Sequence, residues 1–129
     1  MTGITLYATA GMSARVAGIE ETHERLVKLV EELDAFYSRD ALRLGLAGRD
    51  RELLPELNGL LTAVEAGVEA LVREALVNSG KSDRAIQVAI VLMSFPVWSG
   101  FNRLGLPASD LAALKVRLLE CAIRSARPT

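Results

Sequence analysis

Hydrophobic residues recur at helical spacing over most of the chain. In the first third they follow one another in alternating steps of three and four, the spacing of a seam between packed helices. These positions are Val16, Ile19, His23, Leu26, Val30, Leu33 and Tyr37. Glutamate, arginine and lysine fill most of the positions between them. The pattern predicts a long amphipathic helix over residues 13–37 that ends near residues 38–40.

A second long helix is predicted over residues 51–77, after a short helix at residues 41–47 and a break at residues 48–50. Proline is tolerated in the first turn of a helix but not deeper, so this helix starts either at Arg51 or at Pro55 itself. A wide apolar stripe follows at helical spacing. It consists of Leu53, Leu57, Leu60, Leu61, Val64, Val68, Leu71, Ala75 and Leu76. Gly80 then suits the left-handed position after a helix end.

Residues 86–101 are apolar almost without interruption. They belong to a third helix, predicted from Ser82 or Asp83 to about Arg103, with a kink or break at Pro96. A membrane span needs about 20 apolar residues, and Ser94 and Pro96 interrupt this run, so we expect a buried helix and no membrane contact. A helix that is hydrophobic all round must be covered on all sides. We therefore expect part of the cover to come from a second copy of the chain.

The last helix is predicted over residues 107–126. Its apolar stripe is Leu111, Leu114, Leu118 and then Cys121 or Ala122, with Lys115, Arg117 and Arg124 outside it. The whole chain of 129 residues is half hydrophobic but only 5% aromatic, which favours an aliphatic core. We predict an all-α fold, a helical bundle of four to five helices. Residues 1–12 would form an irregular lead, and residues 13–129 a single helical regulatory or dimerisation domain.

The charge and the few reactive residues exclude several classes of function. Fifteen basic and sixteen acidic residues give a net charge of −1, so no basic field attracts nucleic acid. A single histidine excludes metal sites built on several histidines. The lone Cys121 precludes an internal disulfide and is expected to be a small buried hydrophobe. No secretory signal is recognisable, and we expect a cytoplasmic protein without metal or cofactor.

Catalysis by a serine triad would have to use His23, which lies between Glu20 and Glu24. We interpret His23 as a half-buried residue bonded to a carboxylate or a backbone group; the alternative is a polar group in a ligand pocket. Paired carboxylates such as Glu31 and Glu32 face solvent by their spacing, and burial is what would tune their pKa for acid–base work. No catalytic residue is assigned, and we expect a protein that is not an enzyme.

The aromatic residues gather around the predicted break. Trp98 and Phe101 share a helix face, Phe95 joins them if the helix continues through Pro96, and Met93 lies nearby. Such a stripe is more commonly core than ligand site, but a kink opens the packing locally, and Phe36 and Tyr37 could form an opposite wall. The candidate ligand-binding residues are Trp98, Phe101, Met93, Phe36, Tyr37 and His23.

From residue 41 onward the chain resembles the C-terminal regulatory domain of TetR-type transcriptional regulators. Residues 49–53, Arg-Asp-Arg-Glu-Leu, match a turn of that family, and residues 78–80, Asn-Ser-Gly, match its Gly-ended loop. The resemblance implies that the last two helices, roughly residues 83–103 and 107–126, pair with their copies in a dimeric four-helix bundle. It also implies that a small apolar molecule binds among the preceding helices and the start of the third. Residues 10–15 are faintly similar to the turn of the family's helix-turn-helix, for which this chain has no room.

The expected function is therefore a small-molecule-sensing and dimerisation domain of a TetR-like regulator, with the DNA-binding part absent from this chain. The expected partners are a small hydrophobic ligand and a second copy of the chain, without direct nucleic-acid contact. The candidate dimer residues are Ile86, Ile90, Leu111, Leu114 and Leu118. One alternative is a helical interaction or adaptor module without a small-molecule site. The other is a small enzyme, which would need a buried acid or base.

Overall fold

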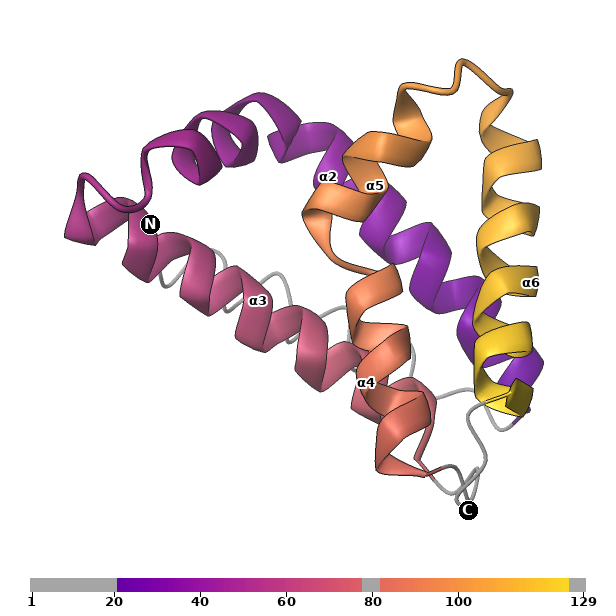
Figure 1. Ribbon diagram of the computed structural model, residues 1–129. Coiled ribbons are helices and arrows are strands. Elements are labelled where there is room, and N and C mark those ends of the chain that lie inside the picture. The colour runs from indigo at the N-terminus through magenta and orange to yellow at the C-terminus, as the bar shows by residue number, and fades with distance from the viewer. Residues whose placement is uncertain (1–20, 78–81, 126–129) are drawn as a thin grey trace.

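The computed structural model describes residues 21–77 and 82–125, and over these residues the chain is helical without strands (Figure 1). The all-α class and the predicted four to five helices are confirmed. In the described part of the chain five helices follow one another: α2 (Thr22–Asp50), α3 (Pro55–Ala75), α4 (Asp83–Leu92), α5 (Phe95–Asn102) and α6 (Ala108–Ser125). The predicted lead, the start of the first helix and the Gly80 stop lie outside the described residues.

Helix α2 organises the fold because three other helices pack on it. Figure 1 shows α3 running back from the far end of α2 toward its beginning, with α5 against the middle of α2 and α6 crossing α2. Helix α4 packs along α6 and contacts α3. The core formed by these contacts is aliphatic, and Leu29, Leu71 and Leu119 are fully buried at its centre. Burying one leucine side chain stabilises a fold by roughly 1.5–3 kcal/mol.

The predicted end of the first helix near residues 38–40 is wrong, because α2 continues without interruption to Asp50. Residues 38–40 contain neither proline nor glycine, and an ion pair between Asp40 and Arg43 at 3.4 Å joins the next turn of the helix to them. Leu44 and Ala47 extend the buried face of α2 beyond Tyr37. The separate short helix at residues 41–47 is thus the last part of α2.

The start of α3 lies at Pro55, one of the two predicted alternatives. Backbone N–H groups of Leu53 and Leu54 donate to the carbonyl of Asp50, which turns the chain between α2 and α3. Leu53 lies in this turn, where it is 77% exposed, so its assignment to the apolar stripe is wrong. From Leu60 onward the stripe is buried as predicted.

The third predicted helix is divided into α4 and α5, which are bent by 50° with respect to each other. Ser82 caps α4 by accepting a hydrogen bond from Ala85 N at 3.2 Å. Ser94 is extended, with φ −71° and ψ 156°, and Pro96 stands in the first turn of α5. Proline lacks an N–H and collides with the preceding turn, so the predicted break falls just before Phe95.

In α6 the buried stripe differs from the predicted one. Lys115, expected outside the stripe, is buried, and Cys121, expected inside it, is exposed. The buried aliphatic residues are Leu111, Val116, Leu119 and Ile123. Packing against both α2 and α4 turns α6 so that its face around Lys115 points inward, and Cys121 lies on the other side.

Arg25 of α2, placed by its spacing on the outer face, is also buried. Its Nε donates to Ala75 O at 2.8 Å and its Nη2 to Val77 O at 3.2 Å. The last carbonyls of a helix lack partners within the helix, and here a guanidinium from the neighbouring helix satisfies them. Arg25 therefore fixes the end of α3 against the beginning of α2.

Candidate functional site

Aromatic side chains from α2 and α5 form one cluster beside the break between α4 and α5. The ring of Tyr37 lies 5.4 Å from that of Phe95 and 5.6 Å from that of Trp98, and Phe95 stacks on Trp98 at 5.7 Å. Phe36 contacts Tyr37 at 5.6 Å. Phe36 and Tyr37 thus lie opposite the aromatic residues that follow Met93, as the sequence predicted.

A partly buried polar network joins this cluster to α6. The indole Nε1 of Trp98 donates to Asp34 Oδ1 at 3.1 Å, and Lys115 Nζ donates to the same oxygen at 2.7 Å. The ammonium group also lies 5.9 Å from the ring centres of Trp98 and Phe101. Lys115 is only 6% exposed, so its charge is matched by Asp34 and by two aromatic faces.

The space around this network is too small for a ligand. The void between Asp34, Trp98 and Lys115 holds about 10 Å³, about the room of one water molecule. Met93 lines the same void, and its carbonyl accepts a hydrogen bond from Tyr37 Oη at 2.7 Å. The Trp98 side of the cluster is packed core.

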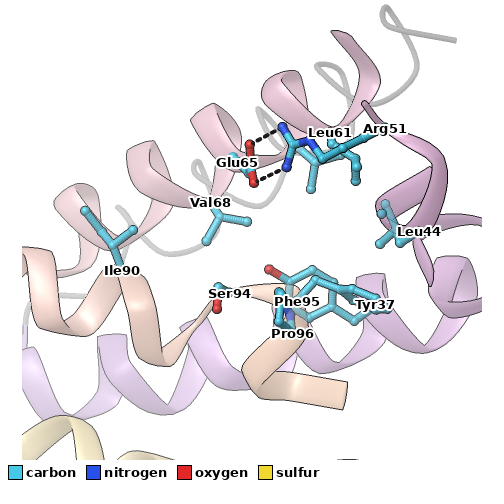
Figure 2. A pocket seen from close by; sticks show the side chains of 12 residues that line it. Tyr37, Leu44, Arg51, Leu61, Glu65, Val68, Ile90, Ser94, Phe95 and Pro96 are labelled. Atoms are coloured by element: carbon cyan, nitrogen blue, oxygen red, sulfur yellow. Dashed lines mark hydrogen bonds and ion pairs between the residues drawn. The ribbon is translucent and has the colours of Figure 1, made fainter. Parts of the chain in front are cut away.

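A larger cavity lies on the other side of Tyr37, between α2, α3 and the α4–α5 break. Its volume is about 130 Å³. Figure 2 shows Tyr37, Phe95 and Pro96 on one side and α3 on the opposite side. Its apolar lining is Tyr37, Leu44, Leu61, Val64, Val68, Ile90, Phe95 and Pro96, together with Gly48 and Ser94.

Helical spacing explains why these side chains converge. Leu61, Val64 and Val68 follow at intervals of three and four and so share one face of α3. The break at Ser94 ends α4 and restarts the chain as α5, so that Phe95 and Pro96 approach α3 from the opposite side. A cavity of about 150 Å³ in another protein holds benzene, so this one suits a small aromatic or aliphatic group.

The cavity carries one ion pair among its lining residues, between Arg51 and Glu65 (Figure 2). Arg51 follows the end of α2, and its Nη1 and Nη2 donate to the two Glu65 oxygens at 3.0 and 3.1 Å. Its Nε donates to Asn58 at 3.0 Å. The hydrogen bond to Glu65 raises the pKa of the Arg51 guanidinium, which is therefore charged at every physiological pH.

Tyr37 contributes a phenol to the lining of the cavity. Burial, and after it the negative charge of Glu65, raise the pKa of this phenol well above its usual range. A phenol in this state is neutral at physiological pH and donates its proton to Met93 O. It therefore serves as a hydrogen-bond donor and a wall, and does not act as a base.

The remaining candidate residues lie apart from the cavity. His23 is exposed, and its Nδ1 lies 3.2 Å from Glu120 Oε2 across a groove between α2 and α6. The predicted bond to a carboxylate is present, but the predicted half-burial of His23 is wrong, because its side chain is 55% exposed. Phe101 is half-buried beside Lys115. Of the six candidates, Tyr37 alone lines the larger cavity.

The residues predicted for a dimer interface are covered to different degrees within one chain. Leu111 is buried, and Ile86, Ile90, Leu114 and Leu118 are half-buried. Ile90 also lines the cavity. Their role between two copies stays a prediction.

Sequence reasoning missed most of the cavity wall, above all Leu44, Val64, Val68 and the pair Arg51–Glu65. The valines were recognised as core residues, and the Phe95–Pro96 break as an opening in the packing. The valines and the break lie on opposite sides of a cavity that is also lined by α2 beyond residue 40. The sequence predicted that this helix ends near residue 40, so the cavity could not be predicted.

Neither a metal centre nor a membrane span is apparent in the described part of the chain. Within residues 21–77 and 82–125 no three histidine, cysteine or acidic side chains are grouped to hold a metal ion. In the same residues no single helix is long and apolar enough to cross a membrane; α4 and α5 reach that length and hydropathy only as a bent pair. Comparison of the chain with protein families, with curated proteins and with solved structures gives no match.

Proposed function

We propose that this chain is a small-molecule-binding helical domain that senses an apolar effector, as the regulatory domains of TetR-type regulators do. The observation that carries the proposal is the cavity of about 130 Å³ bounded by α2, α3 and the α4–α5 break. Its lining is almost entirely apolar. Ligand sites are typically concave and apolar with a few polar groups that fix orientation.

The position of the cavity supports a sensing role. Its wall includes Ile90, Ser94 and Phe95, which belong to the two helix ends that meet at the break. A ligand that fits one setting of this break better than another shifts the equilibrium between the two. Helices α4 and α5 contact α6 through packing and through Lys115. The resemblance to TetR-type domains from residue 41 onward agrees with this arrangement.

The proposal is tested by filling the cavity. Toluene is the probe, because its size matches the cavity, and binding is measured as a rise in melting temperature and as shifts in the protein NMR spectrum. Val64→Phe places a ring inside the cavity and is expected to abolish both effects. Val77→Phe, the same change at an exposed position just after α3, is the matched control and should bind toluene as the unaltered chain does.

Circular dichroism of both variants verifies that they are folded. If millimolar toluene changes neither the melting temperature nor the spectrum of the unaltered chain, the proposed function is wrong. The same conclusion follows if Val64→Phe folds and binds toluene with unchanged affinity.

A helical interaction module is the second candidate, and one observation favours it. Leu42, Leu46, Leu53 and Leu54 are exposed around the turn between α2 and α3. Exposed large apolar side chains of this kind are candidates for contact with another protein. This candidate gains support if toluene is not bound and if Leu42→Asp disrupts an association of the purified protein.

A further inference from the structure

The charged groups that line the cavity differ in how firmly they are held. Arg51 is fixed by three hydrogen bonds from its guanidinium, one to Asn58 and two to Glu65. Its side chain is 30% exposed, whereas that of Glu65 is 60% exposed. In the described part of the chain the carboxylate of Glu65 is bonded by Arg51 alone. Arg51 is thus the anchored partner, and Glu65 is the one that can leave.

From this asymmetry we infer that the cavity takes a small apolar molecule bearing a carboxylate, which replaces Glu65 on Arg51. The inference rests on the function proposed above and names the chemical class of the ligand. The apolar body would contact Val64, Val68 and Phe95, and the carboxylate would accept the two hydrogen bonds from Nη1 and Nη2. Guanidinium and carboxylate groups match in this two-bond geometry.

Replacement of Glu65 is inexpensive because its carboxylate already faces water. Exposed ion pairs contribute little to stability, and the displaced carboxylate is hydrated again when it swings outward. Burial of the ligand's apolar body offsets the translational and rotational freedom that the ligand loses on binding. Its carboxylate then adds two charge-assisted hydrogen bonds to Arg51, less the small contribution of the exposed Glu65 pair that it replaces.

The same geometry disfavours a cationic ligand. An ammonium group would have to displace Arg51 from Glu65. That displacement breaks the two hydrogen bonds from the guanidinium to the Glu65 oxygens, while the bond from Nε to Asn58 still holds Arg51 in place. It would also place two positive charges beside each other at the rim of the cavity. A neutral ligand gains the apolar wall but no charged hydrogen bond.

The inference is tested with ligands that share a ring and differ in charge: benzoate, benzamide and benzylamine, with toluene as the apolar reference. Calorimetric titration at neutral pH measures their affinities. We expect benzoate to bind about tenfold more tightly than benzamide, the factor that one charge-assisted hydrogen bond supplies. Benzylamine should bind more weakly than both. The preference for benzoate should shrink in high salt.

Two variants assign this preference to the ion pair. Glu65→Gln removes the competing charge and should tighten benzoate binding several-fold relative to the binding of toluene. Arg51→Gln should remove the preference for benzoate over benzamide. Glu65 is exposed on a helix surface, so its substitution is not expected to disturb the fold.

The outcomes separate this inference from the proposed function. If toluene binds but benzoate binds no more tightly than benzamide, or if Glu65→Gln weakens benzoate binding, the carboxylate inference is overturned and the cavity remains a ligand site. If none of the four probes binds, both the inference and the proposed function are wrong.

Discussion

At the scale of single residues, Tyr37 connects the parts of the candidate site. Its ring packs in the aromatic cluster and also lines the cavity. Its hydroxyl donates a hydrogen bond to Met93 O, at the break between α4 and α5. The end of a helix leaves carbonyl groups without partners. A phenol from α2 satisfies one of them at the end of α4, so Tyr37 holds the break in its bent form.

Tyr37 predicts a loss of stability at high pH. The phenol of an unfolded chain titrates at about 10, and burial with the charge of Glu65 raises the pKa of Tyr37 in the folded protein. Its contribution is therefore complete below pH 10 and is lost as the pH rises from there toward the folded pKa. In the Tyr7→Phe variant, which has one tyrosine left, phenolate absorbance should appear only together with the loss of helical circular dichroism.

Tyr37→Phe is the control for this experiment, because its stability should fall less steeply above pH 10. It should also be less stable at pH 7, by roughly 1–3 kcal/mol, since a buried carbonyl loses its donor. Phenolate absorbance that rises near pH 10 while the helices stay intact would contradict the burial of Tyr37.

Single residues also show where sequence reasoning succeeds and where it stops. Leu26, Val30, Leu33 and Tyr37 are buried as their spacing predicts, because a helix presents every third and fourth residue to one side. Lys115 is buried although its spacing predicts an exposed position. Its partner Asp34 is 81 positions away, and a pattern within one helix carries no information about such a partner. The prediction that Arg25 is exposed is wrong for the same reason, because its partners Ala75 and Val77 lie on another part of the chain.

At the scale of helices, the pair Asp34–Lys115 with Trp98 ties α2, α5 and α6 together. The two partners are not equivalent: Lys115 is 6% exposed and Asp34 is 30% exposed. When Lys115 is removed, Asp34 keeps its bond to the indole and reaches water. When Asp34 is removed, an ammonium group stays buried without its counter-charge.

This asymmetry predicts unequal effects on stability. Asp34→Ala should lower the free energy of unfolding by about 3 kcal/mol, whereas Lys115→Met, which keeps the packing of the stem, should cost about 1 kcal/mol or less. The double variant should recover most of the loss caused by Asp34→Ala. Urea unfolding followed by the fluorescence of Trp98, the only tryptophan, measures all three. Equal losses in the two single variants would mean that the charges are not buried as described.

Helix boundaries were predicted where the chain contains a residue that forces them. Pro55 and Pro96 both stand in the first turn of a helix, as the geometry of proline requires. Residues 38–40 contain polar side chains but no proline or glycine, and tertiary packing of Leu44 carries α2 across them. The cavity lies beside that continued part of α2, which is why the sequence indicated a pocket but not its wall.

At the scale of the whole molecule, the apolar surface left on α4 bears on assembly. Val91 is 61% exposed and Val88 is 38% exposed. We propose that a second copy of the chain covers this surface, as the apolar run of residues 86–101 and the resemblance to TetR-type domains lead us to expect. Such burial would stabilise the dimer by roughly 25 cal/mol for each Å² of apolar surface removed from water.

Val91→Asp is therefore expected to shift the protein from dimer to monomer in light scattering, with helical content unchanged because the position is exposed. Leu42→Asp, at a leucine on the far part of α2 that is 78% exposed, is the matched control and should leave the dimer intact. A monomer at high protein concentration in the unaltered chain would contradict this assembly. Dissociation by Leu42→Asp alone would instead place the contact at the turn between α2 and α3.

The hydrogen bonds from Arg25 to the carbonyls of Ala75 and Val77, at the end of α3, affect how α2 and α3 can move. Helices α2 and α3 are joined by the chain itself at residues 51–54, and Arg25 fastens them again at their opposite end. The two helices are thus linked at both ends. A ligand in the proposed cavity would therefore act mainly on the segment around Ser94, which forms the remaining wall, and so on α5 and, through Lys115, on α6.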